Sequence, residues 1–203
     1  MITLLFWIII CILVARVIPE TKLSIAKTRW ISYCILMLVL IIFIVLVKQD
    51  NKYQLLFPLL IATYPITLID LNHHKIPNNL NFYLALSQTV ILAIGFSFNF
   101  KINFIEGVIA GFLMTSLFLI MNALSGGQLG MGDVKLAYVL GLVTGVISYE
   151  VTVLALLIMF LFSGLYSLLL ILFGRVRRDS YIAFGPFMLF GTWMAHLLAP
   201  LFI

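Results

Sequence analysis

Two aspartates, Asp70 and Asp133, stand at the edges of long apolar runs. Asp70 directly follows the run TYPITLI, and Asp133 lies three residues before the apolar run that begins at Leu136. A carboxylate at the centre of a membrane helix costs about 2.5–3.5 kcal/mol on insertion scales and less near the interface. Acids in such positions are functional candidates by default, so we take these two as the candidate reactive groups.

Two nearby carboxylates are suited to activating water for peptide hydrolysis. Because like charges in close contact do not both ionise easily, such a pair shares one proton. The ionised carboxylate takes a proton from water, while the protonated one polarises the scissile carbonyl. A helix N-terminus favours the anion and a C-terminus favours the acid, so the sequence predicts Asp133 as the base and Asp70 as the acid.

Both aspartates lie in turns that contain residues of special backbone geometry. The segment GGQLGMGD holds four glycines, Gly126, Gly127, Gly130 and Gly132. Glycine permits close approach of the backbone and a positive φ, which would make room for an extended peptide, although an ordinary turn between helices has the same composition. Pro65 and Pro77 bracket Asp70, and predict a distorted helix before it and the start of a new helix after it.

The composition places these turns in a membrane protein. Of 203 residues, 64% are hydrophobic and 9% are charged, whereas a soluble domain carries about 25% charged residues. The chain has 12 Lys and Arg against 7 Asp and Glu, a formal net charge of +5. No face is expected to be both basic and soluble, which excludes nucleic acid as a partner. The basic excess is more informative about membrane topology.

The apolar runs predict an all-α, polytopic membrane protein with about eight transmembrane helices. None of the runs alternates as a barrel strand does, and most are long enough to cross about 30 Å of hydrocarbon. Because so little chain remains between them, we expect residues 1–203 to form a single integral-membrane domain. The predicted spans are 2–18, 30–47, 53–69, 80–100, 107–124, two within 132–174, and 182–203.

The basic residues predict the orientation of these spans. Nine Lys and Arg fall in the turns after the first, third, fifth and seventh spans, and only Lys48, Lys52 and Lys101 fall in the opposite turns. Cytoplasmic loops carry the excess of Lys and Arg. We therefore expect both termini outside, and both aspartates at the cytoplasmic face with the lipid bilayer around them.

Three segments resemble motifs of the type IV prepilin peptidases. IDLNHHKIPNNL resembles their Asp-then-Ile-Pro segment, GMGDVKL resembles their Gly-x-Gly-Asp motif, and AFGPF at 183–187 is similar to their Phe-Gly-Pro-Phe segment. The order of the helices also agrees with that family. The similarity extends from about Tyr53 to the end of the sequence, and the segment ARVIPE at 15–20 shows a weaker similarity. The combination of the three motifs is far more specific than the tetrapeptide alone.

The resemblance implies that Asp70 and Asp133 are the catalytic aspartates of an endopeptidase in the bacterial cytoplasmic (inner) membrane. It implies a prepilin or pseudopilin as substrate, a short basic leader cut off after a glycine, and a partner pilus or type II secretion machinery. It also implies that Gly130 and Gly132 shape the substrate site, with Pro77 and Lys135 beside it. We expect no metal and no cofactor.

One departure from the family concerns a second activity. Longer members carry a cytoplasmic domain with two CxxC motifs after the first helix, and N-methylate the new terminus. Here that place holds only PETKLSIAKTR, which lacks zinc ligands and room for a methyl-donor fold. The two cysteines, Cys11 and Cys34, lie inside apolar runs and are expected to be packing thiols. We expect peptidase activity without zinc and without N-methyltransferase activity.

Other site chemistries have partial support in the sequence. His73 and His74 adjoin Asp70, but no third metal ligand follows at a fixed spacing, so a solvated loop or a local proton partner is expected. Ser125 together with His196 resembles a serine rhomboid pair, but Ala123 stands where the first glycine of GxSG is needed. Ser163 has the same weakness.

Two other classes of function stay open at this stage. A proton-coupled transporter or channel would use intramembrane acids as carriers, but predicts inverted repeats and acids near mid-membrane. Both acids here are predicted at one face. A non-catalytic scaffold of a pilus or secretion complex could also retain the two aspartates.

Overall fold

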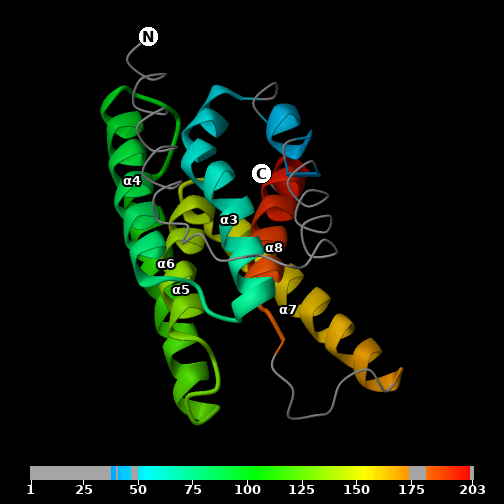
Figure 1. The fold of residues 1–203 in the computed structure, drawn as a ribbon. Coiled ribbons are helices and arrows are strands. Elements are labelled where there is room, and N and C mark those ends of the chain that lie inside the picture. Colours follow the sequence, from blue (N-terminus) through cyan, green and yellow to red (C-terminus); the bar gives the residue numbers. More distant parts are fainter. Residues whose placement is uncertain (1–37, 40, 47–49, 174–181, 202–203) are drawn as a thin grey trace.

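The computed structural model describes residues 38–39, 41–46, 50–173 and 182–201. No strand occurs among them, which confirms the all-α prediction. The predicted span 2–18, most of 30–47, both cysteines and the basic run at 175–178 lie outside the described residues. The elements (Figure 1) are η1 (Asn51–Leu56), α3 (Phe57–His73), α4 (Asn78–Ser97), α5 (Phe104–Leu124), α6 (Met131–Gly145), α7 (Tyr149–Leu172), α8 (Gly185–Leu198) and η2 (Ala199–Leu201).

Four helical segments in the described part of the chain are long and apolar enough to cross a membrane. They are Lys52–His73, α4, α5 and α7, and they correspond to the predicted spans 53–69, 80–100, 107–124 and the second span within 132–174. Their composition agrees with the membrane protein expected from the sequence.

The prediction of full crossings is wrong for α6 and α8. These helices have 15 and 14 residues, or about 22 and 21 Å, against about 30 Å of hydrocarbon. The described residues therefore do not support eight spans. Their apolar side chains are buried inside the protein, as Leu140 and Val143 in α6 and Leu189 and Trp193 in α8 show, each 0% exposed. Packing against neighbouring helices favours the same residue types as contact with lipid.

Helix α6 packs closely on α5 because both helices present small residues. A Cβ added at Gly141 would lie 2.6 Å from the carbonyl oxygen of Ala110, and one at Gly145 would lie 2.4 Å from the Cβ of Ala110. On α5, a Cβ at Gly111 would lie 2.9 Å from the carbonyl oxygen of Tyr138. Small residues spaced four apart let membrane helices approach to backbone contact. This contact fixes α6 along α5.

Buried polar side chains connect α8 to its neighbours. The indole Nε1 of Trp193 donates to Oγ1 of Thr63 in α3 at 3.1 Å. The two ring nitrogens of His196 lie 2.8 Å from the carbonyl oxygen of Thr192 and 3.1 Å from that of Val143 in α6. Helix α8 is therefore held both to α3 and to α6.

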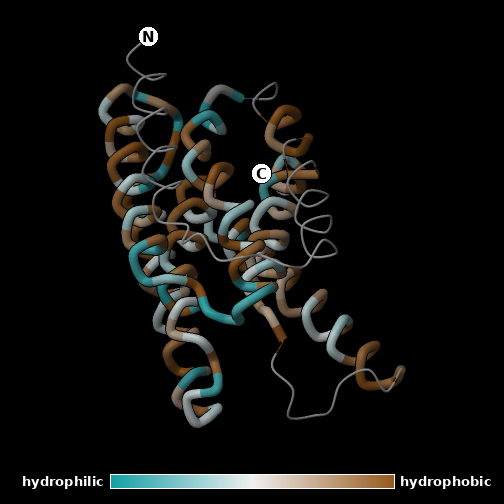
Figure 2. Tube along the Cα trace, in the orientation of Figure 1, coloured by the Kyte–Doolittle hydropathy of each residue, from teal (hydrophilic) through white to brown (hydrophobic). Residues whose placement is uncertain are grey.

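The starts of α6 and α8 lie at the level where α3 ends, while α5 and α7 continue past it on separate sides (Figure 1). The amide of Asn103 donates to the carbonyl of Val146 at 2.9 Å, which places the start of α5 beside the end of α6. Since α5 has 21 residues and α6 has 15, α5 extends about 9 Å further. Hydrophilic residues gather at the α3–α4 connection on this level (Figure 2).

Candidate active site

Asp70 lies in the last turn of α3, where its side chain is only 4% exposed. The helix ends at His73, and His74 adopts the left-handed conformation with a φ of 50°. The amide of His74 donates to the carbonyl oxygen of Asp70 at 2.9 Å. This C-cap closes the helix directly after the aspartate.

The carboxylate of Asp70 accepts a hydrogen bond from the start of α8, 115 positions away. The amide of Gly185 donates to Oδ2 of Asp70 at 2.8 Å. A Cβ added at Gly185 would lie 2.9 Å from the same oxygen, so this close approach requires a glycine. The segment 183–187 stands out in the sequence, but its contact with Asp70 is not predictable from it.

Asp133 lies in the first turn of α6 and is 9% exposed. Its Oδ1 is buried without a hydrogen-bond partner among the described residues. At the two positions on either side of Met131, a side chain larger than that of glycine would meet neighbouring atoms. A Cβ at Gly130 would lie 3.1 Å from Oδ2 of Asp133, and a Cβ at Gly132 would lie 2.9 Å from both Cβ and the carbonyl oxygen of Ile76.

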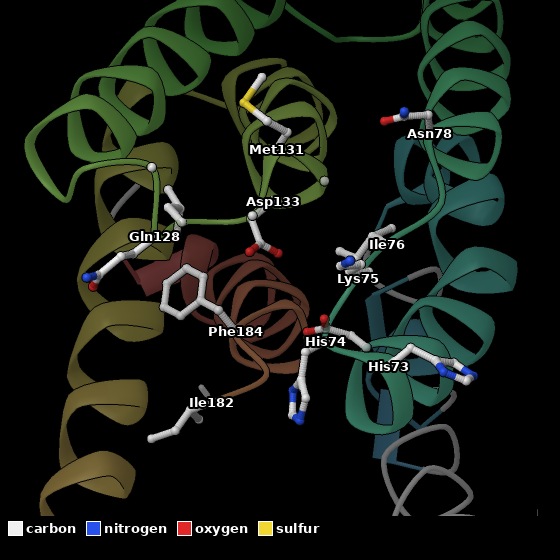
Figure 3. Close-up of a pocket in the computed structure, with 15 residues that line it drawn as sticks. His73, His74, Lys75, Ile76, Asn78, Gln128, Met131, Asp133, Ile182 and Phe184 are labelled. Carbon is white, nitrogen blue, oxygen red and sulfur yellow. The ribbon is translucent and has the colours of Figure 1, made fainter. Parts of the chain in front are cut away.

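Both aspartates line one cavity of about 670 Å³. Its lining residues come from three segments, within 70–78, 127–133 and 182–184. Figure 3 shows the carboxylate of Asp133 pointing into the cavity, with Gln128 and Phe184 on one side and Lys75 and Ile76 on the other. The fold thus brings together two carboxylates that are 63 positions apart in the sequence.

The other predicted site residues divide into two groups. Gly130 and Gly132 line the cavity, whereas Pro77 and Lys135 do not. Pro77 is the N-cap of α4, as its position in the sequence predicts. The Nζ of Lys135 donates to Oδ1 of Asn78 at 2.6 Å in an exposed contact, and Asn78 does line the cavity. Lys135 therefore lies at the edge of the cavity.

The structure gives no support to the alternative site chemistries. His73 and His74 line the cavity, but no group of three metal-ligating side chains occurs in the described part of the chain. His196 is fully buried with both ring nitrogens against backbone carbonyls. The hydroxyls of Ser125 and Ser163 donate to the carbonyls of nearby residues in their own helices or at the helix end, so neither forms a pair with the histidine.

The two carboxyl groups have different electrostatic surroundings. Asp133 lies outside the four candidate spans, and burial, together with the charge of Asp70, raises its pKa to about 7. Asp70 instead receives the Gly185 amide at the N-terminus of α8, where the helix dipole favours an anion. This geometry favours Asp70 as the base and Asp133 as the acid, the reverse of the assignment predicted from the sequence. The sequence could not place α8 against Asp70.

The family model of the type IV leader peptidases matches residues 54–172. The chain belongs to this family. The match confirms the resemblance noted in the sequence and implies that the chain is a peptidase, that is, a hydrolase. Searches of curated proteins and of solved structures give no significant match.

The matched region of this leader peptidase contains both aspartates, but it ends before the segment 183–187. That segment enters the site through the Gly185–Asp70 hydrogen bond. Sequence reasoning missed one further residue, Asn81, whose amide reaches the backbone beside Asp133. Its only signal in the sequence is that it is one of several asparagines after Pro77.

Proposed function

We propose that this leader peptidase is an aspartic endopeptidase that removes the short basic leader of a type IV prepilin or pseudopilin. The single observation that carries the proposal is that two buried aspartates, Asp70 and Asp133, line one cavity. An aspartic dyad needs two carboxyl groups in one site, one ionised and one protonated. The different surroundings of Asp70 and Asp133 support such a division of roles.

The reaction follows from these surroundings. Asp70, with Oδ2 held by the Gly185 amide, takes a proton from water, and the water oxygen attacks the scissile carbonyl carbon. Asp133 lends its proton to the carbonyl oxygen as the tetrahedral intermediate forms. Collapse breaks the C–N bond, the leaving nitrogen takes up a proton from the dyad, and the new carboxyl group stays on the leader. No metal or cofactor is needed.

The proposed setting is the bacterial inner membrane, with the site on the cytoplasmic side and both termini outside. The distribution of basic residues in the sequence supports this orientation. A bitopic substrate would bring the junction between its basic leader and its apolar helix to the cavity. The pilus or type II secretion machinery would receive the processed protein. N-methyltransferase activity is not part of the proposal.

Co-expression with a prepilin tests the proposal. The wild-type chain should shorten the prepilin by its leader, and Asp70→Ala and Asp133→Ala should each leave it uncut. Glu150→Gln is the matched control, because this exposed acid lies in the first turn of α7, far along the chain from the cavity segments. Cleavage by both aspartate variants would refute the proposal. A wild-type chain that instead carries protons into liposomes would favour the transporter.

A further inference from the structure

One buried amide lies next to the site without belonging to the cavity wall. Asn81 is in the first turn of α4 and is 1% exposed. Its Nδ2 donates to the carbonyl oxygen of Gly132 at 2.8 Å, across 51 positions of sequence. Gly132 directly precedes Asp133, so this bond joins α4 to the backbone of a candidate catalytic residue.

We infer that Asn81 is a positioning residue, which holds the first turn of α6 so that the Asp133 carboxyl keeps its place in the cavity. The inference rests on the proposed function, since it assigns Asn81 a part in that reaction. Asn81 is not among the residues that line the cavity. It acts through the peptide unit between Gly132 and Asp133.

The start of α6 has few other restraints in the described part of the chain. Its N-cap, Gly130, provides no side-chain hydrogen bond. In the preceding loop, Gly126 and Gly127 have φ values of 68° and 83°, and a Cβ at either would meet no atom within 4 Å. The loop is thus open on its outer side, and does not itself fix where the helix begins.

The other side-chain hydrogen bonds to this part of α6 are exposed. Asn122 Nδ2 lies 3.5 Å from the sulfur of Met131, and Lys135 Nζ donates to Asn78. Water competes with both contacts, which weakens them. The donor of the Asn81 bond belongs to a buried residue, so water competes less with this bond, and its loss would leave the Gly132 carbonyl without that partner.

Ile76 adds a steric contact that limits movement of the turn in the direction opposite to the one that the hydrogen bond limits. It lies against Gly132 so closely that a Cβ there would come within 2.9 Å of its Cβ and of its carbonyl oxygen. Ile76 therefore limits how far the turn can move towards the α3–α4 connection, and Asn81 limits how far it can move away. Together they fix the position of Gly132, and the next side chain is that of Asp133.

Gln88 provides a matched control on the same helix. It lies seven residues after Asn81 on the buried face of α4 and is 0% exposed. Its Nε2 donates to the carbonyl oxygen of Leu55 at 2.9 Å. In both residues the side-chain oxygen is buried and has no partner among the described residues. The two amides have the same chemistry, but the Gln88 bond ends in η1 and not in the site.

The experiment compares Asn81→Leu with Gln88→Met in the purified full chain, with a prepilin as substrate. Both replacements keep the approximate shape and remove the donor, so similar falls in Tm are expected. Asn81→Leu should lower kcat by about 10- to 100-fold with KM within about 3-fold, because small displacements of a catalytic group cost about this much. Gln88→Met should keep kcat within about 2-fold.

A conservative variant provides a readout that a purely structural role would not change. Asn81→Asp keeps the shape, and its carboxyl can donate to the Gly132 carbonyl only while it is protonated. The ratio of its kcat to that of Asn81→Leu should therefore rise as the pH falls. A ratio that is independent of pH would contradict the inference.

Hydrogen exchange of the backbone separates this inference from the proposed function. Without substrate, exchange of the backbone amides of residues 131–134 should be faster in Asn81→Leu than in the wild-type chain. It should also be faster in Asn81→Asp at high pH, but not in Gln88→Met. If the wild-type chain cuts no prepilin, the proposed function fails and exchange alone decides the role of Asn81. If exchange and kcat change equally in the Asn81 and Gln88 variants, the positioning role is overturned.

Discussion

The two aspartates have similar burial but different partners. Asp70 lies in the last turn of a helix and accepts a hydrogen bond from an amide at the start of another helix. Asp133 lies in the first turn of a helix, and one of its oxygens has no partner in the part of the chain that the structure describes. The residue types and their apolar surroundings were sufficient to predict both candidates from the sequence. Their surroundings were not predictable, because Gly185 reaches Asp70 across 115 positions, and Asn81 reaches Gly132, the residue before Asp133, across 51 positions.

The raised pKa of Asp133 predicts a pH-dependent cost for stability. Its pKa rises from 3.8 to about 7 in the folded chain through burial and the charge of Asp70. The folded state thus binds the proton more tightly than the unfolded state, and stability is lost as the pH rises from about 4 to about 7. Asp133→Asn should raise the Tm by more at pH 8.5 than at pH 5, because more of this loss has occurred at the higher pH, and it should abolish cleavage.

Thermal unfolding in detergent at the two pH values measures this difference. Glu150→Gln serves as the control, because this carboxylate is exposed and hydrogen bonding to Ser148 lowers its pKa, whereas the pKa of Asp133 is raised. An equal gain in Tm for Asp133→Asn at pH 5 and at pH 8.5 would show that ionisation is not its cause.

The Gly185 contact predicts a sharp effect of one methyl group. In Gly185→Ala the new Cβ would lie 2.9 Å from Oδ2 of Asp70, so the carboxylate or the start of α8 must shift. We expect kcat for prepilin cleavage to fall by about 100-fold, the scale on which a displaced catalytic group loses rate. Gly164→Ala in α7, whose Cβ would meet no atom of the described residues within 4 Å, should keep wild-type kcat. Equal rates in both variants would contradict a functional role of the contact.

At the scale of the elements, the site depends on two helices that are too short to cross a membrane. The sequence predicts that α6 and α8 are helical, but their apolar runs do not distinguish a helix surrounded by lipid from one surrounded by protein. The lengths of 15 and 14 residues have a consequence for the site. Each helix begins beside a carboxyl group, α6 beside Asp133 and α8 beside Asp70. Polar backbone amides therefore lie where a full span would place apolar side chains.

The close packing of α5 on α6 predicts that a larger side chain in the contact destabilises the fold. In Gly141→Val the side chain would have to occupy space taken by Ala110 and Gly111, whose backbone atoms lie 2.6 and 2.8 Å from the position of a Cβ. Overpacking of this kind costs about 1–3 kcal/mol. Thermal unfolding in detergent should show a clearly lower Tm for Gly141→Val and an unchanged Tm for Gly164→Val. A lower Tm for both would point to helix propensity as the cause instead.

On the scale of the whole molecule, the cavity is recessed, because two of the helices around it extend beyond it. Helix α5 continues about 9 Å past the start of α6, and α7 continues past the start of α8 on the other side (Figure 1). A substrate peptide would therefore have to pass between these helices to reach the carboxyl groups. The proposed reaction fits this arrangement only if the same end of the molecule faces the compartment that holds the basic leader.

Cysteine labelling tests this orientation. With Cys11 and Cys34 replaced by serine, a single cysteine is placed at Lys75→Cys, on the edge of the cavity, or at Lys101→Cys, between α4 and α5. Both lysines are exposed. A membrane-impermeant maleimide added to intact cells should label Lys101→Cys at once, and should label Lys75→Cys only after the inner membrane is opened. The reverse pattern would put the carboxyl groups on the outer side, away from a leader that stays in the cytoplasm, and the leader-removing activity would then be excluded whatever the dyad does.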